Sequence, residues 1–187
     1  MAFPPAHLLV GAGFAEVARA ASPNPPPRWK AWAVGGCVAM LPDVDMVLGI
    51  VRGVGGAYHG TFTHSILAVL ACALVAYLVG GGQWAAVVGL AYGSHLLVDL
   101  LDDSGPTNLM LGWPFSTHPA YSLGKFFPKV PIEGYSLANT IRIMLLPASL
   151  RLFALQTALA AACCAALLLL AAAIRRVRER RVATAAD

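Results

Sequence analysis

Long apolar stretches alternate along the chain with short segments rich in proline, glycine and charged residues. The longest, residues 153–174, contains 22 residues and no charged side chain. A bilayer core of about 30 Å is crossed by about 20 apolar residues in a helix. The pattern therefore predicts a last transmembrane helix at 152–174, followed by a basic tail at 175–187.

Two further pairs of apolar segments predict helical hairpins. Residues 62–101 contain two apolar runs of 18 residues each, joined by three glycines and a glutamine. Residues 3–41 contain two runs separated by the sequence SPNPPPR, whose prolines cannot continue a helix. We therefore expect a first hairpin at 3–41 and a second at 62–101. The first hairpin either spans the bilayer or lies tilted and partly inserted.

Residues 102–150 differ in composition from the apolar runs. They are rich in proline, glycine, serine and aromatic residues of the kind that settle at the membrane–water interface. This predicts an irregular cap over one end of the bundle. The expected fold class is all-α, with residues 1–187 forming a single membrane domain: an integral helical bundle of about five helices with an interfacial cap.

Composition supports a membrane protein. The chain is 58% hydrophobic and 12% charged, with a mean hydropathy of +0.70, whereas soluble domains average about 45–50% apolar and about 25% charged residues. So few charges cannot cover a soluble surface, and they exclude a disordered chain. The four cysteines lie inside apolar runs without metal-finger spacing, so they are expected to be small buried hydrophobes.

Basic residues predict an orientation. The formal charge is +4, and five arginines crowd into the tail. If the tail is cytoplasmic, its side of the membrane holds eight basic residues and the other side five. This favours a multi-pass protein of the cell's inner (plasma) membrane with a cytoplasmic tail and an outer-face site, although the modest bias leaves the opposite topology open. The cluster is an orientation signal, and no nucleic-acid partner is expected.

Histidines and acids gather at the ends of the predicted helices. Folding the second hairpin about its turn places His64 opposite Asp99, and folding the first places His7 opposite Asp43. His95 lies four residues before Asp99, so both side chains share one helical face. Both pairs lie at the ends remote from the turns, where they can converge.

Imidazole nitrogens and carboxylate oxygens are the ligands that zinc and similar divalent ions prefer. The predicted metal ligands come from both hairpins and the LPDVD segment: His7, Asp43, Asp45, His64, His95 and Asp99. His59 and Asp45 are the candidate catalytic residues, and His59 is expected either to hydrogen-bond to a metal ligand or to act as a proton shuttle. One or two divalent ions, with zinc expected, suit phosphoester hydrolysis because two metals can clamp the attacking and leaving oxygens.

Each candidate also has a simpler interpretation. Asp43 and Asp45 can cap a helix, and His7 can be an interfacial histidine. Asp102 and Asp103 are expected at a solvated helix end rather than as ligands. These alternatives stay open at the level of the sequence.

Four motifs in order, AHLLVGA, LPDVD, HGTFTHS and GSHLLVDL, resemble the membrane-bound metal-dependent hydrolase family of bacteria and archaea (YdjM-like). The resemblance extends from His7 to about Ser116 and implies a membrane hydrolase with its site at these residues. Gly60 stands where such members often carry arginine, so an assisting cation is missing or supplied elsewhere, for example by Arg52. The His95–Asp99 spacing is also similar to a metal-binding pair in the zinc-dependent phospholipase C and single-strand nuclease superfamily.

The expected function is a membrane-embedded metal-dependent hydrolase that cleaves a phosphoester of a lipid or lipid-linked molecule through a metal-activated water. Its expected partners are membrane lipid and this lipid-like substrate, and the oligomeric state is left open. The alternatives are a non-catalytic membrane protein with a structural metal, or an ion-binding transporter. A structural zinc has four protein ligands, and a transporter has broken helices at the bilayer midplane.

Overall fold

A computed structural model describes residues 3–54, 58–102, 107–128 and 137–184. Within these ranges the chain forms seven α-helices, one 3₁₀ turn and no strand, so the predicted all-α class is confirmed. The helices are α1 (Pro4–Ala21), α2 (Arg28–Val38), α3 (Val44–Val51), α4 (Ile66–Gly80), α5 (Gly82–Leu100), α6 (Leu137–Met144) and α7 (Pro147–Thr184).

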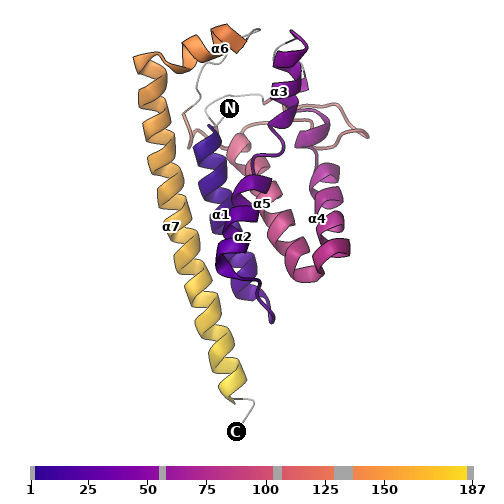
Figure 1. Ribbon diagram of the computed structural model, residues 1–187, viewed down its shortest axis with the longest axis vertical. Coiled ribbons are helices and arrows are strands. Elements are labelled where there is room, and N and C mark those ends of the chain that lie inside the picture. Colours follow the sequence, from indigo (N-terminus) through magenta and orange to yellow (C-terminus); the bar gives the residue numbers. More distant parts are fainter. Residues whose placement is uncertain (1–2, 55–57, 103–106, 129–136, 185–187) are drawn as a thin grey trace.

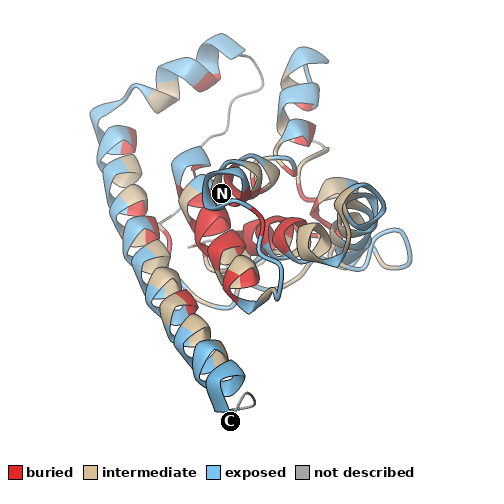
Figure 2. Ribbon diagram, turned by 60° about the horizontal axis from the view of Figure 1, so that its bottom comes forward, coloured by how far each residue is buried: buried red, intermediate tan, exposed pale blue. Residues whose placement is uncertain are grey.

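Helix α1 lies at the centre of the molecule. It packs against α2, α5 and α7, and α4 covers the outer side of α5 (Figure 1). Close contact between α1 and α2 depends on glycine, because a Cβ at Gly11 would lie 2.4 Å from the Ala39 Cβ. Buried residues are concentrated on the central helices, as Figure 2 shows, whereas α4 buries none of its residues completely. The exposed apolar side chains of α4 suit contact with lipid.

Helix α7 is the one helix in the described ranges that is long and apolar enough to cross a membrane, judged by length and composition. It contains the predicted span at 152–174. At 38 residues it is roughly 57 Å long by its rise per residue, so it exceeds the thickness of the bilayer core. Helix α4 is apolar but shorter, with 15 residues. The predicted bundle of about five membrane helices therefore stays a prediction.

Several helix ends differ from the sequence prediction. Helix α4 begins at Ile66 rather than at 62, because Ser65 caps it by accepting a hydrogen bond of 3.1 Å from the Ala68 amide. Residues Phe62–His64 form a 3₁₀ turn before it, named η2. Helix α2 ends at Val38, three residues before the predicted end at 41.

Two short helices were not among the predicted elements, and the basic tail is helical over most of its length. Helix α3 follows the first hairpin, and α6 lies inside the predicted cap, whose described residues 107–128 contain no helix. The basic segment continues α7 as far as Thr184. Residues 129–136 of the cap and 185–187 of the tail lie outside the described ranges.

Candidate metal centre

Six predicted ligands meet at the end of the bundle where α1 begins. They come from four separate segments: His7 from α1, Asp43 and Asp45 from the start of α3, His64 from η2, and His95 and Asp99 from α5. The three histidines are completely buried. Imidazoles and carboxylates that are far apart in sequence are therefore gathered in one water-excluded place.

A first group consists of His7, His95 and Asp99. Asp99 contacts both histidines, with Oδ2 3.1 Å from His95 Nε2 and Oδ1 3.5 Å from His7 Nε2. The two imidazoles stack with their centroids 3.8 Å apart. One ligand atom from each residue lies within 4.8 Å of the others. The group has the size and the donors of a metal site, and His7 makes its close contact with Asp99 rather than with Asp43.

A second group consists of Asp43, His59 and His64, again with ligand atoms within 4.8 Å of one another. It adjoins the first group directly. Asp43 Oδ1 lies 3.6 Å from His95 Nε2, and His64 Nε2 lies 3.1 Å from His95 Nε2 and 3.5 Å from Asp99 Oδ2. The pairing of His64 with Asp99 is the one that the hairpin geometry predicts. Because side chains of the two groups are in contact, the groups can hold either one shared ion or two neighbouring ions.

Several buried atoms of the cluster have no hydrogen-bond partner. They are both ring nitrogens of His7 and both carboxylate oxygens of Asp43 and of Asp99. An unsatisfied buried polar atom costs about 1–3 kcal/mol, and more when it is charged. A cation bound among these nitrogens and oxygens would remove the cost, and the donor set is the one that zinc and similar divalent ions prefer. The residues therefore fit a metal ion.

Asp45 has a different environment from Asp43 and Asp99. Its Oδ1 lies 3.2 Å from His59 Nδ1, its Oδ2 lies 3.1 Å from His64 Nδ1, and Thr63 donates its hydroxyl to Oδ2 at 2.5 Å. A carboxylate on Nδ1 fixes the orientation of a histidine whose Nε2 faces a metal. This geometry favours a positioning role for Asp45 over the predicted direct ligation. The Ala39 carbonyl holds His95 in the same way, 2.7 Å from Nδ1.

The acids around His64 control its charge. Burial opposes the charged imidazole, but the carboxylates of Asp45 and Asp99, 3.1 and 3.5 Å from its ring nitrogens, outweigh burial and raise the pKa of His64 to about 9. Burial also opposes the charged carboxylate of Asp45, yet its hydrogen bonds with His59 and His64 lower the pKa of that carboxyl. A proton on His64 therefore balances part of the negative charge, and a metal ion would compete with that proton.

The structure corrects the expectation for Asp102 and explains the glycine at position 60. Asp102 is buried, with 3% of its surface exposed, rather than lying at a solvated helix end as predicted; Asp103 lies outside the described residues. Gly60 has a φ of +85°, and a Cβ there would lie 2.4 Å from the Asn108 carbonyl oxygen. This chain therefore has no room for an arginine at position 60, and Arg52 is exposed at the end of α3.

A buried ion pair at the other end of α1 was not predicted from the sequence. Glu16 is fully buried and accepts hydrogen bonds from Arg19 and from the Trp32 indole at 2.9 Å, and from Arg175 of α7 at 2.7 Å. The three-residue spacing to Arg19 is a local signal, but Trp32 and Arg175 are distant in sequence. Glu16 follows His7 by nine residues, or about 13 Å along a helix, so the pair is separate from the metal cluster.

The fold and the cluster define a class: a helical protein with one described helix that is long and apolar enough to cross a membrane, and with a buried candidate metal centre. The family model of the YdjM inner membrane protein matches residues 1–178, and the chain belongs to this family. No curated protein and no solved structure matched the chain. Family membership and the apolar helix α7 together support a membrane location.

Proposed function

We propose that the protein is a membrane-embedded hydrolase that uses one or two divalent ions, zinc in the first place, to cleave a phosphoester of a lipid or lipid-linked molecule. The observation that carries the proposal is the buried cluster in which His7, Asp43 and Asp99 present nitrogens and oxygens without hydrogen-bond partners. A site that only stabilised the fold would not need two adjoining ligand groups.

The residues divide into holding and positioning roles. His7, His95 and Asp99 would hold one ion, and Asp43 and His64 would hold a second or complete a shared site. A divalent ion bound there would polarise the phosphoester and activate the attacking water. Asp45 fixes the rings of His59 and His64 through their Nδ1 atoms, so the ligand nitrogens need little reorganisation.

His59 is proposed to transfer protons. Its side chain is 15% exposed, whereas those of His7, His64 and His95 are not exposed at all. A general acid–base group must reach both the reacting atoms and a proton source. The position of His59 at the edge of the cluster meets the first requirement, and its exposure meets the second.

The proposed topology places the site on the outer face of the inner membrane. Arg175 and Arg178 of α7 contact Glu16 and Ala20 near the end of α1, while His7 lies near its beginning. If the basic end of α7 is cytoplasmic, as the positive-inside rule favours, the metal cluster lies towards the opposite side. The proposed multi-pass arrangement is consistent with this placement.

A structural metal is the second candidate, because the complete burial of three histidines is typical of a closed site. A catalytic site must instead be open to a substrate. Asp43 favours the catalytic role, because it lines a cavity as well as facing the histidines.

Metal analysis of the purified protein, combined with a lipid-phosphoester hydrolysis assay, tests the proposal. We expect bound divalent metal in the wild type, loss of that metal in His64→Ala and in Asp99→Asn, and turnover that stops when a chelator is added. Unchanged metal stoichiometry in both variants would remove the site. Chelator-insensitive turnover would contradict the mechanism, and metal without any turnover would favour the structural alternative.

A further inference from the structure

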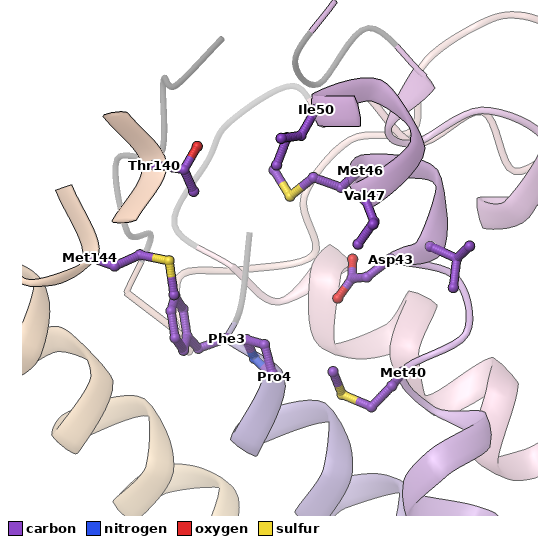
Figure 3. A pocket seen from close by; sticks show the side chains of 10 residues that line it. Phe3, Pro4, Met40, Asp43, Met46, Val47, Ile50, Thr140 and Met144 are labelled. Carbon is purple, nitrogen blue, oxygen red and sulfur yellow. The ribbon is translucent and has the colours of Figure 1, made fainter. Parts of the chain in front are cut away.

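A cavity of about 240 Å³ lies between α3 and α6, beside the N-terminal end of α1. Figure 3 shows Met46, Val47 and Ile50 of α3 along one wall, Met144 of α6 along another, and Phe3 at the start of α1. Most of the lining is apolar, and methionines can adjust their shape to a flexible ligand. These properties fit a hydrocarbon chain better than a polar metabolite.

The cavity reaches the metal cluster through one residue. Asp43 is the one charged residue among the described residues that line it, and Asp43 Oδ1 also lies 3.6 Å from His95 Nε2. The cavity therefore has an apolar body and a single end at which a cation would be held. A ligand that matches both parts has an alkyl chain and an anionic head.

We propose that this cavity binds the hydrocarbon chain of a single-chain amphiphilic phosphoester, with its phosphate at the Asp43 end. The position of the phosphate rests on the proposed function, whereas binding of the chain depends only on the lining. The volume of the cavity favours one hydrocarbon chain over two. Pockets for drug-sized ligands have volumes of about 300–1,000 Å³, and this cavity is smaller. A second acyl chain would have to lie outside it.

The outer side of the cavity suits entry from the membrane. On α3, Val44, Val47 and Val51 are 55%, 60% and 78% exposed. Val44 and Val47 line the cavity as well, whereas Val51 does not. An apolar helix surface at the mouth lets a chain pass from lipid into the cavity without crossing water.

Photolabelling in nanodiscs tests the proposal. The probe is dodecyl phosphate with a diazirine at the end of the chain, and the labelled peptides are identified by mass spectrometry. We expect saturable labelling at 40–50 and 140–144 that excess unmodified dodecyl phosphate reduces at least tenfold. Labelling of the exposed α4 residues Leu74 and Leu78 reports contact with bulk lipid and should not respond to the competitor.

Two tryptophan substitutions on α3 provide a matched pair. Val47→Trp fills the cavity and should lower its labelling about tenfold, while Val51→Trp adds the same side chain outside the cavity and should leave labelling at the wild-type level. Cavity labelling that is not competed, or that falls equally in both variants, would overturn the proposal. Equal competition by a two-chain phosphatidate would overturn the preference for one chain.

A second probe separates this inference from the proposed function. The corresponding photoreactive dodecanol has no phosphate, so it should label the cavity equally in the wild type and in Asp99→Asn. Dodecyl phosphate should label Asp99→Asn several-fold less than the wild type. If dodecanol labels the cavity competitively in a protein that binds no metal, the site for the hydrocarbon chain is supported and the metal-dependent function is refuted. If a metal-loaded protein shows no dodecanol labelling, the site for the hydrocarbon chain is refuted and the metal centre is supported.

Discussion

Asp45→Asn should weaken metal binding without abolishing it. The substitution keeps the shape of the side chain but removes the charge that faces His59 Nδ1 at 3.2 Å and His64 Nδ1 at 3.1 Å. Loss of such an orienting group typically costs about 10–100-fold in metal affinity, which corresponds to about 1.4–2.7 kcal/mol. The ligands of both groups are still in place, so binding should stay measurable.

Two further variants bracket the expected loss of metal affinity in Asp45→Asn. Asp99→Asn removes a carboxylate that lies within 3.5 Å of three histidines, so it should cost more than Asp45→Asn. Thr63→Val removes the hydroxyl that donates to Asp45 Oδ2 and also lies 3.0 Å from His64 Nδ1; a hydrogen bond to a charged group is worth about 1.5–3 kcal/mol. Because the Asp45 carboxylate still faces His59 and His64 in this variant, we expect its effect on metal affinity to be smaller than that of Asp45→Asn.

Competition against a chromophoric zinc chelator, with purified protein in detergent, measures these affinities. Glu179→Gln is the control, because it neutralises an exposed acid of α7 far along the chain from the cluster. If Asp45→Asn loses as much affinity as Asp99→Asn, Asp45 is a direct ligand and the positioning role is refuted. If Asp45→Asn binds zinc as tightly as the control, Asp45 has no influence on the metal.

Three other predictions concern charge, stability and backbone. Glu16→Gln weakens the hydrogen bonds from Arg19, Trp32 and Arg175 and should cost about 2 kcal/mol, or about 4–8 °C in Tm; scanning fluorimetry should find no such shift in Glu179→Gln. Zinc binding at pH 7.5 should displace a proton from His64, whose pKa of about 9 keeps it protonated in the metal-free protein; identical calorimetric heats in two buffers of different ionisation enthalpy would refute this. Gly60→Ala should destabilise more than Gly53→Ala, because both have positive φ but only Gly60 has a neighbour, 2.4 Å from an added Cβ; equal Tm values would show that the contact with Asn108 is relieved.

Local periodicity was enough to predict part of the site. The four-residue spacing of His95 and Asp99 and the symmetry of the second hairpin placed these residues beside His64, because helix geometry fixes which side chains share a face. The all-α class followed from the same apolar runs.

Contacts between distant segments were not predictable in the same way. Helix α3 is short and follows Pro42, so its apolar residues gave no clear period, and the environment of Asp45 depends on where this helix packs. Glu16 is held by Trp32 and Arg175, which approach it only after α2 and α7 have packed against α1. The burial of Asp102 likewise depends on residues that are distant in sequence, including its bridge to Phe127.

X-ray absorption at the zinc edge of the purified protein identifies the atoms that bind the ion. The described cluster contains only imidazole and carboxylate donors, so we expect nitrogen and oxygen neighbours at about 2.0–2.2 Å from the zinc. Sulfur neighbours at about 2.3 Å would show that the cysteines bind the ion instead, and a protein that takes up no divalent ion would contradict the proposed metal centre.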